Sequence, residues 1–298
     1  MLLRGSEIME NVPEVSWLWE EIIPRKFITI LASRGGVGKS GFALWLADML
    51  TGQGMTVLYV DAERCGSHIV QRAKAWQLNN FNNILFTSEK LTDQCVETAE
   101  HKTTADLQAY VIESKADLVI LDSLTILARK LDMNKRETIA QFFEEITGVA
   151  NHGNAGILLL AHTKKIQLDN QELNIDSIAG SGAITDLARS VLLMEKGLTD
   201  TERIIHHIKS NFAAPVNDIT FDLTNFGIKN LQITRTPSTV RLTGSDADLY
   251  RNIAVRGLSK GITLREAREE LKKVGASPVE YKRALDYASS ELNIQWIK

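Results

Sequence analysis

The feature that most constrains the fold of this chain is a glycine-rich segment between two apolar runs. Residues 33–40 read SRGGVGKS, residues 26–31 before them read KFITIL, and residues 41–50 after them read GFALWLADML. The first run is typical of a buried strand, and the second is apolar on nearly every side, as in a helix that a sheet and its neighbours cover. A strand, a glycine-rich loop and a helix in this order predict an α/β fold with a phosphate-binding loop.

Each residue type in the loop has a chemical reason to be there. Three glycines let the backbone bend so that its N–H groups point at phosphate oxygens, and the helix adds its N-terminal dipole. Lys39 supplies a charge for the β- and γ-phosphates, and the hydroxyl of Ser40 is a ligand for Mg²⁺. We therefore predict that ATP and Mg²⁺ bind here. The expected nucleotide-binding residues are Arg34, Gly35, Gly36, Val37, Gly38, Lys39, Ser40 and Gly41.

Ser33 departs from the common pattern, which has glycine at this position. The position forms the start of the loop, where a small polar residue is compatible with the turn. The alternative is a glycine-rich turn that matches the pattern by coincidence. The strand before it and the helix after it favour the nucleotide site, because the motif requires that context.

Strand-like and helix-like segments alternate over the first two hundred residues. Buried strands are expected at residues 56–60, 84–86, 118–121 and 157–160, and helices at 67–76, 104–115 and 135–149. This alternation predicts a mostly parallel sheet covered by helices on both faces. Further strands are expected at residues 190–194, 203–208, 219–223 and 228–233. Because no helix separates them, they indicate antiparallel additions at the sheet edge.

Length and composition predict a second, smaller domain. A chain of 298 residues is long enough for about two domains, and residues 237–245 have the Pro, Gly and hydroxyl content of a linker. We expect a core domain at 1–236 and a helical, winged-helix-like domain at 246–298. The latter contains 10 Lys or Arg and 8 Asp or Glu, so both DNA contact and protein docking stay open.

Carboxylates follow two of the predicted strands. Asp122 ends the LVIL run, where an acid at the carboxyl edge of the sheet can hold Mg²⁺, although a turn residue is the alternative. Glu63 follows VLYVDA and is expected to deprotonate the attacking water as general base. Asp61 is its competitor, and either residue could instead cap a helix. We favour Glu63, because alternation along the strand places both on one face with Glu63 farther out.

His162 follows the strand GILLLA at the same edge. It could sense the γ-phosphate through a hydrogen bond, although a lone histidine is more often structural. The other histidines and the two cysteines, Cys65 and Cys95, have no spacing that suggests a metal site.

Composition excludes several classes of protein. The net charge of −3 excludes a polybasic chain that coats nucleic acid by bulk charge. Two cysteines argue against a disulfide scaffold, and no run of 18 apolar residues exists. We therefore expect a cytoplasmic protein with no membrane partner.

Several runs together resemble a known family. VSWLWEEIIPRKFITILASRGGVGKS, VLYVDAE, LVILDS, LLLAHTKK and IAGSGAITDLARSVLL are similar to the RecA-like ATPases of the plasmid RepA helicase type, and more distantly to DnaB-type helicase motors. The resemblance covers residues 12–233. It implies a RecA-like core with Lys39 and Ser40 on phosphate and Mg²⁺, and Asp122 as the Walker B acid. It also implies Glu63 as catalytic base and His162 as sensor.

The same resemblance implies a residue that acts in trans, on the nucleotide of a neighbouring subunit. HHIKSNFAAPVNDITFDL is similar to the late strand and turn that carry this residue in such rings, and Lys209 matches the finger lysine. The companion arginine of DnaB-type motors is Asn211 here, and Arg189 is a less favoured substitute. A solvated lysine at a strand end is the alternative for Lys209.

Taken together, the residues and the resemblance predict an enzyme: a ring-forming, hexameric ATP hydrolase that translocates on single-stranded DNA. Plasmid, phage or mobile-element replication is the expected setting. The expected partners are further copies of the chain, single-stranded DNA, and a replication initiator or other protein at residues 246–298. The polar loop between His162 and Ser181 could contact DNA or be a plain surface loop. An ATP-gated regulator or loader without unwinding activity is the alternative function, and a small-molecule kinase ranks last.

Overall fold

The computed structural model describes residues 14–87, 104–129, 131–164, 175–180, 182–197, 199–215 and 218–233, together with Arg4, Gly5 and Met9. The chain divides into two compact units, residues 1–165 with 173–236 and residues 166–172 with 237–298, and every described residue lies in the first. The predicted linker at 237–245 and the predicted domain at 246–298 lie outside the described residues.

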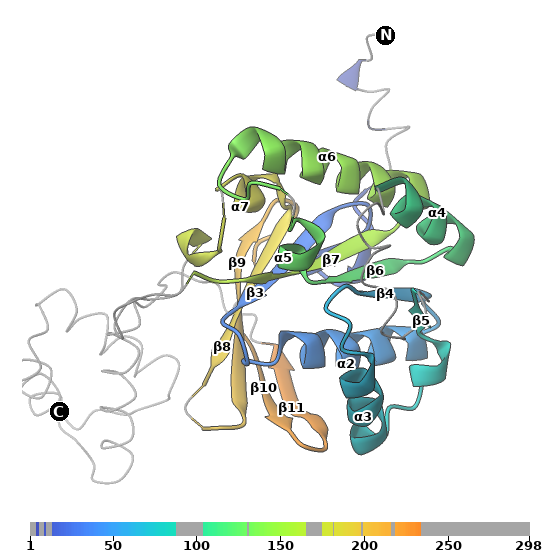
Figure 1. Cartoon of the computed structure of the whole chain (residues 1–298), viewed down its shortest axis with the longest axis vertical. Coiled ribbons are helices and arrows are strands. Elements are labelled where there is room, and N and C mark those ends of the chain that lie inside the picture. The colour runs from blue at the N-terminus through green and yellow to red at the C-terminus, as the bar shows by residue number, and fades with distance from the viewer. Residues whose placement is uncertain are drawn as a thin grey trace, which may run out of the picture. The chain divides into compact units, whose positions relative to one another are not determined.

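The strand that leads into the glycine-rich loop lies in the interior of the main sheet. Among the described residues this sheet has nine strands in the order β11-β10-β9-β8-β3-β7-β6-β4-β5 (Figure 1). The bounds are β3 Ile28–Ser33, β4 Val57–Asp61, β5 Leu85–Phe86, β6 Leu118–Asp122, β7 Gly156–His162, β8 Ser190–Lys196, β9 Glu202–Ser210, β10 Asp218–Thr224 and β11 Gly227–Ile233. Strands β3 to β8 run parallel to one another, and β9, β10 and β11 are antiparallel additions beyond β8. A separate hairpin joins β1 (Trp17–Trp19) to β2 (Ile23–Pro24).

Helices cover both faces of the sheet (Figure 1). One face packs against α2 (Lys39–Gly52) and α3 (Gly66–Trp76), with Leu31, Leu158 and Leu192 of the strands turned toward α2 in a shared core. The other face packs against α4 (Thr104–Ser114), α5 (Leu124–Leu127), α6 (Arg136–Gly153) and α7 (Ala183–Leu187). Alternate strand residues therefore enter two cores, as a parallel sheet buried on both sides requires. In the described ranges, no helix is long and apolar enough to cross a membrane.

The register of the parallel strands brings polar strand ends to one edge. Ser33 at the end of β3 lies opposite His162 at the end of β7, and Asp61 of β4 lies opposite Asp122 of β6. Each of these residues follows a run of buried apolar residues. The carboxyl edge therefore gathers side chains that are up to 129 positions apart in the chain, Ser33 and His162 being the farthest.

The predicted sheet with helices on both faces is confirmed, and one part of the topology is corrected. We expected all four late strands to be antiparallel, but β8 pairs parallel with β3, and the antiparallel strands begin with β9. The reason is α7, which the sequence pattern did not reveal because it spans only residues 183–187. This short helix lies between β7 and β8, so the chain can return and run parallel.

Candidate nucleotide site

The glycine-rich loop has the backbone geometry of an anion cradle. Gly36 has a φ of 76° and Gly38 a φ of 118°, both in the left-handed region that favours glycine. Gly38 is the N-cap of α2 and makes no side-chain cap, so the N–H groups of the first turn stay available to an anion. A Cβ on Gly35 or Gly36 would meet no atom within 4 Å. This open space on the glycine backbone fits the phosphates of a nucleotide.

Lys39 is buried beneath the loop, with 6% of its surface exposed. Its Nζ donates to Oγ of Ser33 at 3.1 Å and to the Ser33 carbonyl at 3.4 Å, and it lies 3.3 Å from Nδ1 of His162. Burial lowers the pKa of Lys39, while the charges of Asp122 and Glu63 oppose that shift. Ser33, which departs from the glycine of the common pattern, therefore has a role of its own: its hydroxyl holds the lysine and donates to the Arg34 carbonyl at 2.8 Å.

Asp122 is held from two sides at the end of β6. The hydroxyl of Tyr59 donates to its Oδ2 at 2.7 Å, and the hydroxyl of Ser40 bonds to the same carboxyl group. Burial raises the pKa of Asp122, and these two hydrogen bonds oppose the shift by stabilising the carboxylate. A carboxylate beside the Ser40 hydroxyl is the donor set that suits Mg²⁺, a hard cation that prefers oxygen ligands.

Glu63 completes the same network from the segment after β4. Its Oε1 accepts a hydrogen bond from Oγ of Ser123 at 2.5 Å and lies 3.8 Å from Nε2 of His162. The side chain of Glu63 is 33% exposed, so water can reach it. A fixed carboxylate that water can reach has the properties of a general base.

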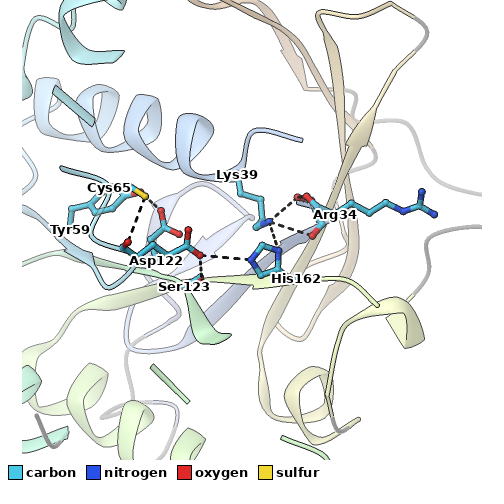
Figure 2. A network of polar contacts seen from close by, with 9 residues as sticks. Arg34, Lys39, Tyr59, Cys65, Asp122, Ser123 and His162 are labelled. Atoms are coloured by element: carbon cyan, nitrogen blue, oxygen red, sulfur yellow. Dashed lines mark hydrogen bonds and ion pairs between the residues drawn. The ribbon is translucent and has the colours of Figure 1, made fainter. Parts of the chain in front are cut away.

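The tautomer of His162 follows from its neighbours. The Lys39 ammonium can only donate, so Nδ1 must accept from it, and the proton of a neutral imidazole then lies on Nε2, on the side of Glu63. Burial and the Lys39 charge lower the pKa of His162, which favours this neutral form. The histidine thus links the phosphate-binding lysine to the candidate base. Figure 2 shows Lys39 and His162 directed toward each other.

The two competing carboxylates, Asp61 at the end of β4 and Glu63 after it, differ in their access to water. Both carboxylate oxygens of Asp61 are buried, and burial raises the pKa of Asp61. Glu63, two residues on, instead contacts Ser123 and approaches His162. Of the two carboxylates, Glu63 is the one that water can reach, and its role as the base stays a prediction.

Three further loop residues were expected at the site. The Arg34 side chain is exposed and points away from Lys39 and Asp122 (Figure 2). Val37 is buried, and its carbonyl accepts a hydrogen bond from Nε of Arg203. A Cβ on Gly41 would lie 3.0 Å from the ring of Trp76, so only glycine fits there without a shift.

Lys209 lies apart from this network within the chain. It pairs with Val191 in the β8–β9 ladder, and Val191 pairs with Ile30 of β3, so Lys209 lies toward the amino end of β3. The phosphate loop leaves the carboxyl end of that strand. The Lys209 ammonium donates to the carbonyls of Thr185 at 2.7 Å and Asp186 at 2.9 Å, and burial lowers its pKa. Asn211, at the place of the companion arginine, is exposed.

Sequence reasoning missed Tyr59 and Ser123. Tyr59 is fully buried in β4, two residues before Asp61, and a phenol in an otherwise aliphatic strand needs a partner for its hydroxyl. That need was a usable signal, and Asp122 meets it. Ser123 gave no such signal, because a serine after a strand-ending aspartate is common in turns.

The loop between His162 and Ser181 falls mainly outside the described residues. Lys164 is described and exposed, whereas Lys165 and residues 166–174 lie outside, as does Ser181. The expectation of DNA contact at this loop therefore stays a prediction.

The chain is similar in sequence to a known domain family and to DNA repair proteins. The AAA domain family matches residues 3–167. The DNA repair protein RadA of Aquifex aeolicus is 26% identical over 208 residues, covering 68% of this chain and 41% of RadA. RadA of Rickettsia felis is 26% identical over 196 residues, covering 65% of this chain and 40% of the relative. The chain thus spans about two fifths of the length of these relatives.

Solved structures with a similar fold include helicase and recombinase chains. A DnaB-like replicative helicase superposes with a TM-score of 0.60 at 13% identity, covering 76% of this chain and 66% of the helicase chain. The RadB recombinase gives 0.51 at 16% identity, covering 71% of this chain and 93% of the recombinase. A further solved ATPase domain gives 0.58 at 13% identity, covering 76% of this chain and 95% of that domain. These likenesses confirm the RecA-like core of the predicted fold.

Proposed function

Since the chain belongs to the AAA domain family, we propose that it is an ATP-dependent DNA motor. In its specific form, the proposal is a ring of identical subunits, a hexamer of the RepA helicase type. The ring hydrolyses ATP at its subunit interfaces and translocates on single-stranded DNA during plasmid, phage or mobile-element replication.

One observation carries the proposal. Lys39, Asp122, Glu63 and His162 come from four separate segments and meet in one polar network at the carboxyl edge, beside an open glycine loop. The set combines a phosphate-binding cation, an acid with a hydroxyl for Mg²⁺, and a carboxylate that water can reach. These are the components that hydrolysis of a nucleoside triphosphate needs.

Bound ATP with Mg²⁺ would supply the phosphoryl group and the charge that neutralises it, and the residues of this chain have distinct parts to play. The loop amides and Lys39 bind the phosphates, and Ser40 with Asp122 holds the metal. Glu63, oriented by Ser123, takes the proton of the attacking water at Oε1 or Oε2. His162, protonated on Nε2, lies between Lys39 and Glu63 and can report the state of the phosphate site to the segment after β7.

The trans-acting component of the proposal is Lys209. In its own chain its ammonium bonds to carbonyls near the end of α7 and lies away from Lys39. A cation in that position can stabilise phosphoryl charge only on a nucleotide held by another subunit. Names of similar proteins support the DNA part: RadA is a DNA repair protein, and one structural neighbour is a replicative helicase.

The test is ATP turnover with and without single-stranded DNA, paired with mass measurement in the presence of nucleotide. The proposal expects turnover that DNA stimulates and a mass that is a multiple of the subunit. Turnover that DNA leaves unchanged, in a protein that stays a monomer, would refute the motor. DNA-stimulated turnover without strand displacement would instead indicate the ATP-gated regulator or loader.

A further inference from the structure

A buried arginine in the antiparallel part of the sheet donates a hydrogen bond to the backbone of the phosphate loop. Arg203 of β9 is buried, with 7% of its surface exposed. Its Nε donates to the Val37 carbonyl at 2.7 Å. Its Nη1 donates to the carbonyls of Asp200 at 2.8 Å and Glu202 at 2.7 Å. The guanidinium thus joins the middle of the phosphate loop to Asp200, in the turn before β9, and to the first residue of β9.

This hydrogen bond fixes the orientation of one peptide unit in the loop. In a trans peptide the C=O and the following N–H point in opposite directions, because the unit is planar. Arg203 holds the Val37 carbonyl, so the N–H of Gly38 must point away from Arg203. Gly38 has a φ of 118°, and a glycine peptide in this region is otherwise free to rotate.

A second contact from the same edge supports the loop at the same place. A Cβ on Gly38 would overlap Cδ2 of Leu223 in β10, and one on Gly41 would lie 3.8 Å from Cδ1 of Leu223. The leucine therefore packs against Gly38 at the end of the loop and close to Gly41 in the first turn of α2. The antiparallel strands thus contact the loop twice, through the hydrogen bond of Arg203 and through the apolar side chain of Leu223.

We infer that Arg203 is a positioning residue, which holds the phosphate loop in the conformation that binds nucleotide. The inference rests on the proposed nucleotide site. Arginine suits the position because its planar fork reaches three carbonyls at once, whereas a lysine ammonium on a flexible stem does not reproduce that geometry. Without this hydrogen bond, the Val37–Gly38 peptide can rotate, and ordering it on binding costs affinity.

The experiment measures nucleotide affinity in the full chain with Mg-ADP as the probe, by calorimetry and by the rise in melting temperature that Mg-ADP gives. Arg203→Gln is expected to weaken binding by roughly 10- to 100-fold, the scale of a lost hydrogen bond to a charged group. Arg203→Lys should give a smaller loss, because it keeps the charge but not the fork.

Arg25→Gln is the matched control. Arg25 also donates to a backbone carbonyl, that of Asn154 at 3.0 Å, and to Asp117 at 2.8 Å, but at the amino edge of the sheet. Its loss should lower the melting temperature of the free protein and leave the affinity for Mg-ADP unchanged. A purely structural role for Arg203 predicts the same result for both glutamine variants.

The outcomes separate this inference from the proposed function. Binding in the wild type, loss of binding in Lys39→Ala, and wild-type affinity in a folded Arg203→Gln would overturn the role of Arg203 and leave the nucleotide site standing. If Arg203→Gln does not fold, wild-type affinity in Arg203→Lys overturns it instead. A wild type that binds neither ATP nor ADP refutes the proposed function, and the inference fails with it.

Discussion

Two regions of the molecule contain candidate site residues, and they differ in whether those residues lie together within one chain. At the carboxyl edge, Lys39 and Glu63 are both held by other side chains of the same subunit, Ser33 and Ser123. On β9, the Lys209 ammonium bonds to two backbone carbonyls near the end of α7. In the first region the candidate residues are fixed by neighbouring side chains, and in the second a cation is held away from them. This difference is what the proposed division of the site between subunits requires, and each prediction below tests one side of that division.

The largest effect is expected at the phosphate loop. Lys39→Ala should abolish nucleotide binding and turnover while the fold stays intact, because it removes the side-chain charge that follows the β- and γ-phosphates. Calorimetry with Mg-ATP and a circular dichroism spectrum of the purified variant check both parts. Turnover at the wild-type rate in the folded variant would refute the proposed nucleotide site at the carboxyl edge.

The next effect separates chemistry from binding. Glu63→Gln should bind ATP like the wild type and hydrolyse it roughly 10²- to 10⁴-fold more slowly, because the amide keeps the shape but cannot accept a proton. Single-turnover hydrolysis and equilibrium binding of ATP measure the two quantities separately.

Asp61→Asn is the matched control, since the same change two residues away touches a carboxylate whose oxygens are buried. It should affect stability more than turnover. The reverse pattern, a slow Asp61→Asn and an active Glu63→Gln, would assign the base to Asp61.

The third prediction concerns Lys209, which we propose acts on the nucleotide of a neighbouring subunit. Lys209→Ala should assemble and bind ATP normally but turn it over roughly 10²- to 10³-fold more slowly, because a cation aimed at developing charge lowers the barrier more than it aids binding. Asn211→Arg, which restores the companion residue of DnaB-type motors, should raise turnover.

Mixing two inactive variants tests the action of Lys209 between subunits more directly. Glu63→Gln subunits mixed with Lys209→Ala subunits should recover part of the activity, since some interfaces then pair an intact base with an intact lysine. Activity per subunit that stays constant on dilution, with no recovery on mixing, would show that the site is complete in one chain.

The same division between regions explains what could be predicted from the sequence. Most of the parallel part follows from local patterns, because a buried strand and the polar residue at its end are visible in a short window, such as LVILD before Ser123. The exception is β8, which was expected to be antiparallel. The contacts of Arg203 and Leu223 with the phosphate loop were not predictable. They depend on the pairing of β9 and β10 with the rest of the sheet, which no short window specifies. Helix α7 was not predicted for a different reason. Its five residues are too few to show a helical period in the sequence.

The smallest expected effect concerns Tyr59 and the metal side of the site. Tyr59→Phe removes the hydroxyl that donates to Asp122 at 2.7 Å but keeps the ring, whose centroid lies 5.6 Å from that of Phe86. Burial raises the pKa of Asp122 and the hydrogen bond from Tyr59 opposes this, so the loss of the hydroxyl should raise that pKa further. The proton then competes better with Mg²⁺ for the carboxylate. The acid limb of the turnover–pH profile should therefore move to higher pH by about one unit or less, and more Mg²⁺ should be needed for half-maximal turnover at pH 7. The matched control is Tyr110→Phe on α4, which packs in the core on the opposite face of the sheet and should move neither quantity.

A Tyr59→Phe protein that melts at a lower temperature but keeps the wild-type Mg²⁺ requirement and pH profile would show that Tyr59 only packs in the core. It would also leave Ser40 as the hydroxyl that orients Asp122.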